Sequence, residues 1–487
     1  MAISTTFSGD CFDGVCISFI GGETSMSVLL KLTNVAVYAD KTCLLEPMSL
    51  TLHQGEPLTI LGQTGSGKSL LAQAIMGLLP ENLTVSGDVE VFGRTMTIDE
   101  RKALWGRDLV MLPQEPWNSL DPLMKGVDQV QEVYKFVREK TDEESLSLAE
   151  NDLQHVGLAD NGHKRPGELS GGMAQRLAIA AATAGGAHVI LADEPTKGLD
   201  VSRRDGIVSL LQTRSTLGSL LTITHDVAVA RQLGGLLLVM KEGRLVEQGE
   251  ASQVLDYPKD DYTRELIAAE PSAWTDIAPS VRKDSAENIL VADKVSVKRG
   301  GRTLFDDLSF SIKKGEVVGV VGDSGCGKSS LGDALLNFLP VASGSITRFD
   351  KTAKPYQWLK LYQDPPSAFS ASVTLGKLLD DLINLHGIDR ARIAPLMDRL
   401  SLPKVILERN CLGVSGGELQ RFAILRALLL DPVFLFADEP TSRLDPITAK
   451  EVTALLVELA SEAGCAVLLV SHDPALVQKT CHQVITL

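Results

Sequence analysis

The chain has 487 residues, of which 44% are hydrophobic, and a formal net charge of −15 at pH 7. This length allows roughly two to four domains with hydrophobic cores, and the composition is typical of a soluble globular protein. The acidic balance argues against a surface that coats nucleic acid or anionic lipid, and no apolar run approaches the roughly 18 to 20 residues that cross a bilayer.

The N-terminal segment lacks the pattern of a secretory signal. Residues 1–26 contain no Lys or Arg before their modest apolar patch, and they include acidic residues. The seven cysteines lie at scattered positions, which fits reduced thiols better than a disulfide framework. We therefore expect a cytosolic protein in which residues 1–29 form a disordered, dispensable extension.

Four short motifs occur twice, in the same order. GQTGSGKS (62–69) returns as GDSGCGKS (322–329), LSGG (169–172) as VSGG (414–417), ADEP (192–195) as ADEP (437–440), and ITHD (223–226) as VSHD (470–473). Internal repetition of this kind indicates two copies of one structural unit. Lys68 and Lys328 are 260 residues apart, whereas Glu194 and Glu439 are 245 apart, so the second copy has a shorter insert after its first motif.

The repeats divide the chain into two domains of one fold class. Residues 271–288 are polar and contain Pro and Ser, which predicts a linker between domains at 30–270 and 289–487. Short apolar runs alternate with helical patterns, which predicts an α/β fold with a mostly parallel sheet wrapped by helices. After each glycine-rich motif, apolar residues follow helical spacing: Leu70, Leu71, Ala74, Ile75, Leu78 and Leu79 in the first copy, and Leu331, Ala334, Leu335, Phe338 and Leu339 in the second.

The first motif fits G-x4-G-K-S, the loop that wraps phosphates. Its glycines allow turns that direct several backbone N–H groups and a helix N-terminus at one anion, the lysine reaches the β and γ phosphates, and the serine holds Mg²⁺. One match could be a glycine turn with a chance lysine, but two matches between a strand and a helix are not explained that way. The candidate residues are Gly62, Gly65, Gly67, Lys68 and Ser69, and Gly322, Gly325, Gly327, Lys328 and Ser329.

Four further residue types recur around these loops. An aspartate that ends an apolar strand can hold the Mg²⁺ shell, and the adjacent glutamate can polarise the attacking water as a general base. A histidine after a later strand can contact the γ phosphate and fix the glutamate, although a lone histidine there would be a structural hydrogen-bonder. A glutamine between the first two motifs could sense Mg²⁺ and water. The candidates are Asp193, Glu194, His225 and Gln114, and Asp438, Glu439, His472 and Gln363.

In this order and twice over, these motifs resemble the nucleotide-binding domain of ATP-binding cassette (ABC) proteins, over residues 30–270 and 289–487. The resemblance implies two P-loop ATPase domains, each with an antiparallel β subdomain and a helical subdomain that carries the SGG signature. It also implies that each signature closes the partner domain's site. Ser170, Gly171 and Gly172 would then offer uncharged donors and a helix N-terminus to ATP at Lys328, and Ser415, Gly416 and Gly417 would do so at Lys68.

The resemblance implies a mechanism as well. ATP would hold the two halves together, hydrolysis would release them, and Asp200 and Asp445 would lie in loops that cross the interface and couple the sites. Both copies keep the glutamate and the histidine, so we expect two hydrolytic sites.

The two copies depart from the family pattern at the base-binding position and in one loop. Tyr38 stands where the family stacks an aromatic ring on adenine, but the second copy has Lys298 there, which predicts weaker or less base-selective binding. Cys326 lies inside the second glycine loop, where N–H groups would favour a reactive thiolate; a small residue that only fills space is equally consistent with the sequence.

The tail of the first copy, with Pro258, Tyr262, Thr263 and Leu266, is similar to that of ATPases that drive peptide and nickel importers. This similarity implies a peripheral protein on the cytoplasmic face of the inner membrane, with two transmembrane permease subunits and an extracytoplasmic solute-binding protein as partners. Its cargo would be small peptides, nickel or metal chelates, and no nucleic acid partner is expected.

Three alternatives remain open. A soluble tandem ATPase that acts on ribosomes is disfavoured by the short linker and the acidic balance. A fused sugar-importer ATPase is disfavoured because both sites look intact, and an exporter ATPase is disfavoured only by the tail.

Overall fold

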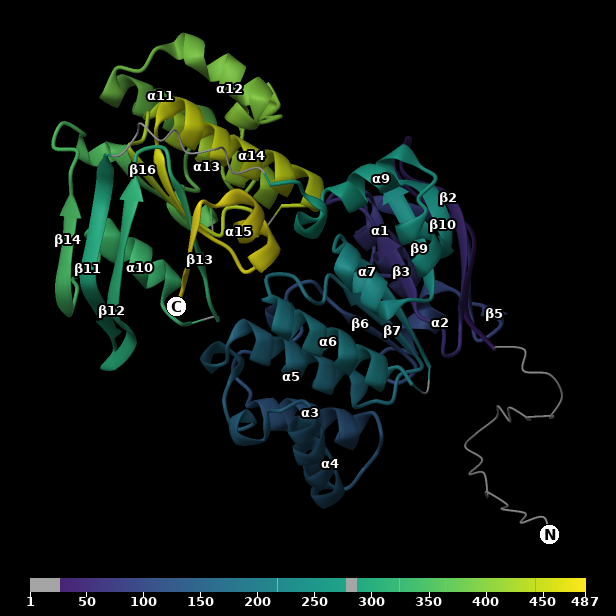
Figure 1. The fold of residues 1–487 in the computed structure, drawn as a ribbon. Coiled ribbons are helices and arrows are strands. Elements are labelled where there is room, and N and C mark those ends of the chain that lie inside the picture. Colours follow the sequence, from purple (N-terminus) through teal and green to yellow (C-terminus); the bar gives the residue numbers. More distant parts are fainter. Residues whose placement is uncertain (1–26, 217, 277–286, 324, 364, 443) are drawn as a thin grey trace.

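The computed structural model describes residues 27–216, 218–276, 287–323, 325–363, 365–442 and 444–487. The predictions for residues 1–26 and for 277–286 of the linker lie outside these ranges. Two α/β halves follow one another along the chain, each with an antiparallel sheet, a mostly parallel sheet and helices around it (Figure 1), so the predicted fold class is confirmed. In the described residues, no helix is both long and apolar enough to cross a lipid bilayer.

The first half contains two sheets. The antiparallel sheet has the order β2 (Thr42–His53), β1 (Val28–Ala39), β4 (Leu83–Val91), β5 (Arg94–Thr95). The larger sheet has the order β10 (Arg244–Glu250), β9 (Leu236–Lys241), β3 (Leu58–Leu61), β8 (Ser219–Thr224), β7 (Val189–Asp193), β6 (Leu109–Leu112). Only the β9–β10 pair is antiparallel. Because helices cover both faces of such a sheet, β7 and β8 are buried along their whole length.

The helices of the first half are placed by their connections to these strands. α1 (Lys68–Met76) follows β3, and α3 (Gly126–Phe136), α4 (Asp142–His155) and α5 (Gly171–Thr183) form the helical subdomain. The remaining helices are α2 (Ile98–Lys102), α6 (Val201–Arg214), α7 (Val227–Leu233), α8 (Ala251–Asp256) and α9 (Asp261–Ala268).

The second half repeats this plan. Its antiparallel sheet has the order β12 (Arg302–Lys313), β11 (Asn288–Arg299), β14 (Ser343–Arg348). Its parallel sheet has the order β15 (Trp358–Leu361), β16 (Phe434–Asp438), β17 (Ala466–Val470), β13 (Val317–Val321), β18 (Gln483–Thr486). The helices are α10 (Lys328–Leu335), α11 (Leu375–His386), α12 (Ile393–Arg399), α13 (Gly416–Leu429), α14 (Pro446–Ala463) and α15 (Pro474–Thr480).

Two helices end earlier than their apolar patterns predict. α1 stops at Met76, because Gly77 takes a left-handed conformation (φ 74°) and its N–H bonds back to the last turn. α10 stops at Leu335. Leu78 and Phe338, which the spacing placed on these helices, therefore lie beyond them and are 45% and 62% exposed.

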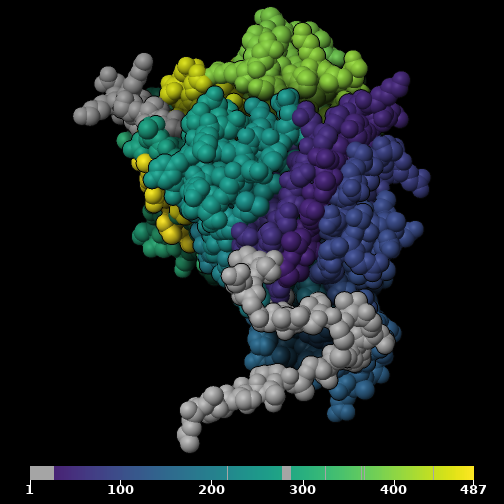
Figure 2. Space-filling view, turned by 90° about the vertical axis from the view of Figure 1, so that its right-hand side faces the viewer, coloured from purple at the N-terminus to yellow at the C-terminus, as the bar shows by residue number. Residues whose placement is uncertain are grey.

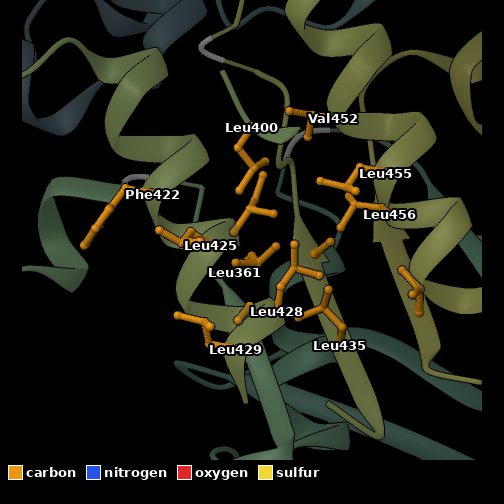
Figure 3. Packing of buried hydrophobic residues seen from close by; sticks show 14 of the residues in the cluster. Leu361, Leu400, Phe422, Leu425, Leu428, Leu429, Leu435, Val452, Leu455 and Leu456 are labelled. Atoms are coloured by element: carbon orange, nitrogen blue, oxygen red, sulfur yellow. The ribbon is translucent and has the colours of Figure 1, made fainter. Parts of the chain in front are cut away.

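Each half has one core cluster between its parallel sheet and the helices of the helical subdomain, and another that joins its two sheets around the helix after the glycine loop. Figure 3 shows this packing in the second half, where Leu425 and Leu428 of α13 belong to one cluster with Leu435 of β16 and Leu456 of α14. All four side chains are less than 8% exposed. Burial of apolar surface stabilises the fold by about 25 cal/mol per Å² and so fixes the position of the strands. The polar motifs come directly after the ends of these strands.

The start of the predicted linker is packed rather than free. Trp274 is 4% exposed, belongs to the core cluster of the second half, and donates from Nε1 to Ala269 O at 2.9 Å. A backbone hydrogen bond also joins the two sheets of the first half, because Glu46 N of β2 donates to Gly243 O beside β10 at 2.8 Å. In Figure 2, β1 and β2 (purple) accordingly lie against the teal segment of the first half that contains β10.

Candidate functional site

Each glycine loop leads from a strand into a helix and is shaped by left-handed glycines. Gly65 and Gly67 have φ of 85° and 94°, and Gly325 and Gly327 have 86° and 114°. Gly67 and Gly327 occupy the N-cap positions of α1 and α10. The loops therefore present helix N-termini and backbone N–H groups in the arrangement that binds an anion.

The loop lysines point back into their own loops. Lys68 Nζ donates to Gly62 O at 2.7 Å and Gln63 O at 2.8 Å, and Lys328 Nζ donates to Gly322 O at 2.8 Å. Each lysine is 6% exposed. Burial lowers the pKa of Lys68, although Glu194 and Asp193 oppose the shift. A phosphate group would replace the carbonyl partners with a stronger, charged one.

Each half brings a glutamate and a histidine together at the ends of neighbouring strands. His225 Nδ1 lies 2.8 Å from Glu194 Oε1, and His472 Nε2 lies 2.6 Å from Glu439 Oε1. Burial disfavours the ionised form of Glu194, but His225 and Lys68 outweigh it, so the pKa of this carboxyl is lowered. A carboxylate kept ionised in this way can accept a proton from water.

The two aspartates fit a divalent cation. Asp193 and Asp438 end β7 and β16, and in both the buried Oδ1 atom has no hydrogen-bond partner. Burial raises the pKa of each carboxyl, while the hydroxyls of Ser69 and Ser329 hydrogen-bond to them and oppose the shift. A buried carboxylate oxygen beside a serine hydroxyl is a ligand pair suited to Mg²⁺, with phosphate oxygens and water as the remaining ligands.

The two predicted glutamines differ in their surroundings. Gln363 Nε2 donates to Glu439 Oε2 at 2.5 Å. Gln114 is exposed. The base-binding position also differs between the halves: Tyr38 is half-buried, whereas Lys298 is exposed. In the second half a ring not predicted from the sequence, that of Phe305, lies beside Gly327.

The serines of the two SGG motifs occupy the N-cap positions of the signature helices, α5 and α13. Ser170 precedes α5 and is exposed, and the space around Gly171 is open. Ser415 precedes α13, and its hydroxyl accepts a hydrogen bond from Glu418 N at 3.2 Å. A Cβ atom added at Gly172 would lie 3.6 Å from the side chain of Leu199, and one added at Gly417 would lie 3.4 Å from that of Leu444. Gly416 is exposed beside them.

The two halves meet along the loops that carry Asp200 and Asp445. Gln63 Nε2 of the first half donates to Asp445 Oδ1 of the second at 2.8 Å, while Asp200 caps its own helix α6. A cavity of about 220 Å³ lies between the halves, and both glutamate–histidine pairs contribute to its lining.

Sequence reasoning missed two sets of contacts. Tyr262, noted only for its place in the tail, accepts a hydrogen bond from Gln63 N at 2.9 Å and so supports the first glycine loop. Lys360 and Asp333 form an ion pair at 2.6 Å beside Asp438. A charged residue inside the apolar run WLKLY was the one available signal for that pair.

Two phosphate loops, each with a strand-end aspartate, a glutamate and a histidine, define a protein with tandem P-loop ATPase domains. A family model described as ABC transporter matches residues 45–197 and 305–442, which together exceed half of the chain. The chain therefore belongs to the ABC transporter ATPases, binds ATP and hydrolyses it in a cycle coupled to transport. The predicted family resemblance is confirmed.

Two relatives cover nearly the whole chain. The peptidoglycan transport ATP-binding protein YejF of Agrobacterium fabrum is 32% identical over 96% of this chain and 92% of its own length. The glutathione import ATP-binding protein GsiA of Escherichia coli K12 is 31% identical over 93% of this chain and 83% of its own. The solved structure of an RNase-L inhibitor matches with a TM-score of 0.65 and 20% identity, over 93% of this chain and 87% of that one, and shares the fold alone.

Proposed function

We propose that the chain is the ATP-hydrolysing subunit of an importer of small peptides, with two ATP sites formed jointly by its two halves. The observation that carries this proposal is that both halves have a glutamate–histidine contact at corresponding positions, of 2.8 and 2.6 Å, each beside its own glycine loop. Both sites keep every group that hydrolysis needs.

Each site has residues for binding the triphosphate. Lys68 and Lys328 would exchange their loop carbonyl partners for β and γ phosphate oxygens, and the loop N–H groups would surround the same oxygens. Mg²⁺, when bound, would neutralise part of the phosphate charge, and Ser69 with Asp193 and Ser329 with Asp438 would hold it.

Each site also has residues for activating water. Glu194 and Glu439 would accept the proton of the attacking water as the bond to the γ phosphorus forms, and ADP would leave on the opposite side. His225 and His472 would orient the glutamates and donate to the γ phosphate. Gln363, bonded to Glu439, and Gln114 would complete the water and metal environment as their loops move.

The signature helices would close the sites crosswise. Ser415, Gly416 and Gly417 would reach ATP at Lys68, and Ser170, Gly171 and Gly172 would reach ATP at Lys328. The contact of Asp445 with Gln63 supports this arrangement, because it joins the second half's loop to the first half's phosphate loop. Asp200 would have the reciprocal role once the interface closes.

The partners and cargo follow from the relatives. They are named for the transport of peptidoglycan and glutathione, which favours peptide-type cargo over the nickel and metal chelates that the sequence left open. The chain would sit on the cytoplasmic face of the membrane, held by two permease subunits, with a solute-binding protein outside.

The test is to purify the full chain with its permeases, place the complex in vesicles, and measure ATP hydrolysis with solute-binding proteins loaded with a small peptide, a nickel chelate or nothing. Stimulation by the peptide-loaded protein is expected. Stimulation by the chelate alone would overturn the cargo, and co-sedimentation of the chain with ribosomes at moderate salt, without permeases, would overturn the importer.

A further inference from the structure

The side chain of Lys360 is a buried cation close to Asp438, the carboxylate proposed to hold the metal in the second site. Lys360 lies in β15, and its side chain is only 10% exposed. Its Nζ is 2.6 Å from Asp333 Oδ1 on α10 and 3.7 Å from Asp438 Oδ2 at the end of β16. The other oxygen of Asp438, Oδ1, is buried and has no hydrogen-bond partner.

Lys360 is confined to this position by its neighbours. Its Nζ lies 5.2 Å from the ring centre of Phe436 and 5.1 Å from that of Tyr362. Aromatic faces attract a cation and exclude water, so the charge of Lys360 acts at close range and with little solvent screening. The lysine is therefore a fixed positive charge, not a mobile surface group.

The first half lacks this charge. Met111 pairs with Leu191 in the β6–β7 ladder as Lys360 pairs with Phe436 in the β15–β16 ladder, so the two residues are equivalent. Asp333 comes five residues after Lys328, and the residue five after Lys68 is Gln73. One half has a methionine and a glutamine where the other has an ion pair.

We propose that Lys360 is a positioning residue of the second ATP site, which holds Asp438 and supplies part of the positive charge that Mg²⁺ would otherwise contribute there. The inference rests on the proposed roles of Asp438 and Lys328. Without metal, Asp438 and Glu439 repel the triphosphate, and Lys360 offsets that repulsion. With metal, Lys360 repels Mg²⁺ and competes for Asp438. Both effects make nucleotide binding at the second site less dependent on Mg²⁺.

The first site has a cation at a different position, and this cation also affects the Mg²⁺ dependence of nucleotide binding there. Lys197 lies on the loop after β7 and is half-buried, where the second half has Ser442. It is close enough to favour the ionised forms of Asp193 and Glu194. Each test therefore changes one site and compares that site with itself.

The test uses the full chain with Lys68→Ala, so that bound nucleotide reports on the second site. Binding of a fluorescent ATP analogue is measured once in the presence of Mg²⁺ and once in the presence of EDTA. The dissociation constant in EDTA divided by that in Mg²⁺ gives the Mg²⁺ dependence, and a larger ratio means a stronger dependence. Lys360→Met with Asp333→Gln, the composition of the first site, is expected to raise this ratio about tenfold, the effect of one charge–charge interaction near the metal. Lys360→Arg, which keeps the charge, is expected to hold the ratio near the parent value.

The reciprocal exchange keeps the inference testable if those variants do not fold. With Lys328→Ala in place, Met111→Lys with Gln73→Asp is expected to lower the ratio at the first site. Ratios that stay unchanged in both exchanges would overturn the role of Lys360 and leave the proposed function standing. Loss of nucleotide binding in both parent backgrounds would overturn the proposed function and this inference with it.

Discussion

Glu194 and Glu439 are held in an uncommon backbone conformation by the strands around them. Their φ angles are 48° and 50°, a region that costs a residue with a Cβ atom about 1 kcal/mol or more. Each residue's N–H bonds to the neighbouring strand, Glu194 to Ile223 O and Glu439 to Val470 O. This sharp turn at the strand end directs both carboxylates at their histidines.

Because both glutamates have the same backbone conformation and each lies against a histidine, we expect them to contribute equally. Glu194→Gln and Glu439→Gln should each lower ATP turnover by a similar factor, and the double variant should fall by about 10²- to 10⁴-fold, the range for loss of a general base. Steady-state phosphate release by the full chain measures this. Loss of turnover in Glu194→Gln with no change in Glu439→Gln would show that only one site hydrolyses ATP.

Glu270, at the junction between the halves, predicts a pH-dependent stability. Burial raises its pKa from 4.5 to about 7, with Asp226 and Asp473 adding to the shift and Arg231 and Arg204 opposing it. Below pH 4.5 the carboxyl is neutral whether the chain is folded or unfolded. Between pH 4.5 and 7 it ionises more readily when unfolded, so stability falls as pH rises and stays reduced above 7.

Glu270→Gln should therefore raise the unfolding temperature at pH 8 relative to pH 5, when each value is compared with the unchanged chain. The gain is about 1 kcal/mol, because Glu270 is partly exposed and solvent screens much of the effect. Glu265→Gln, at an exposed position of α9, is the control and should show no such difference. A shift in Tm that is the same at both pH values would contradict the prediction.

At the scale of elements, the two signature helices begin differently. Ser415 and Glu418 form a capping box, in which Ser415 N donates to Glu418 Oε2 at 2.8 Å. Ser170 makes no side-chain cap bond, and the equivalent of Glu418 is Met173. If α13 closes on ATP at Lys68, the carboxylate of Glu418 faces the triphosphate at the positive end of its helix.

Glu418→Gln should keep the cap, since glutamine also serves in a capping box, and should remove the repulsion. We expect ATP to bind about two- to fivefold more tightly at the Lys68 site, measured with Lys328→Ala and Glu194→Gln in the background. Glu418→Ala, which loses the cap at about 1 kcal/mol, separates charge from helix stability. An affinity that falls in the Gln variant would count against a phosphate near this helix.

The elements also explain what the sequence could predict. The glycine loops and strand-end acids were predictable because their chemistry fixes residue types at short spacings. The end of α1 was misplaced because Leu78 continues the apolar spacing, while the turn depends on the conformation of Gly77. The Lys360 pair was missed because it depends on β15 lying beside β16 and on α10 packing across them, an order that local patterns do not contain.

At the scale of the molecule, the halves are joined by more than the linker. Lys450 Nζ of α14 donates to Ala268 O of the first half at 2.9 Å, and Lys479 of α15 pairs with Asp276 at 3.0 Å. Ile447 packs against the apolar cluster that includes Tyr262. These contacts hold the loop of Asp445 against the first glycine loop. A movement of the second half would therefore shift the residues of the first glycine loop.

Crosswise closure makes a prediction that differs from that of an arrangement in which each half closes its own ATP site. In the background Lys328→Ala with Glu194→Gln, only the Lys68 loop binds ATP, and its closing donors would come from Ser415. Ser415→Glu would place a carboxylate beside the γ phosphate and remove a donor, which should weaken ATP binding about tenfold or more, whereas Ser170→Glu should cost far less. Ser415 makes a side-chain cap bond and Ser170 makes none, so Ser415→Ala, which loses that bond without adding a charge, is the control for the cap. Equilibrium binding of a fluorescent ATP analogue measures the two affinities. An equal loss of affinity in both variants, or a greater loss from Ser170→Glu, would mean that the site at Lys68 is not closed by the second half.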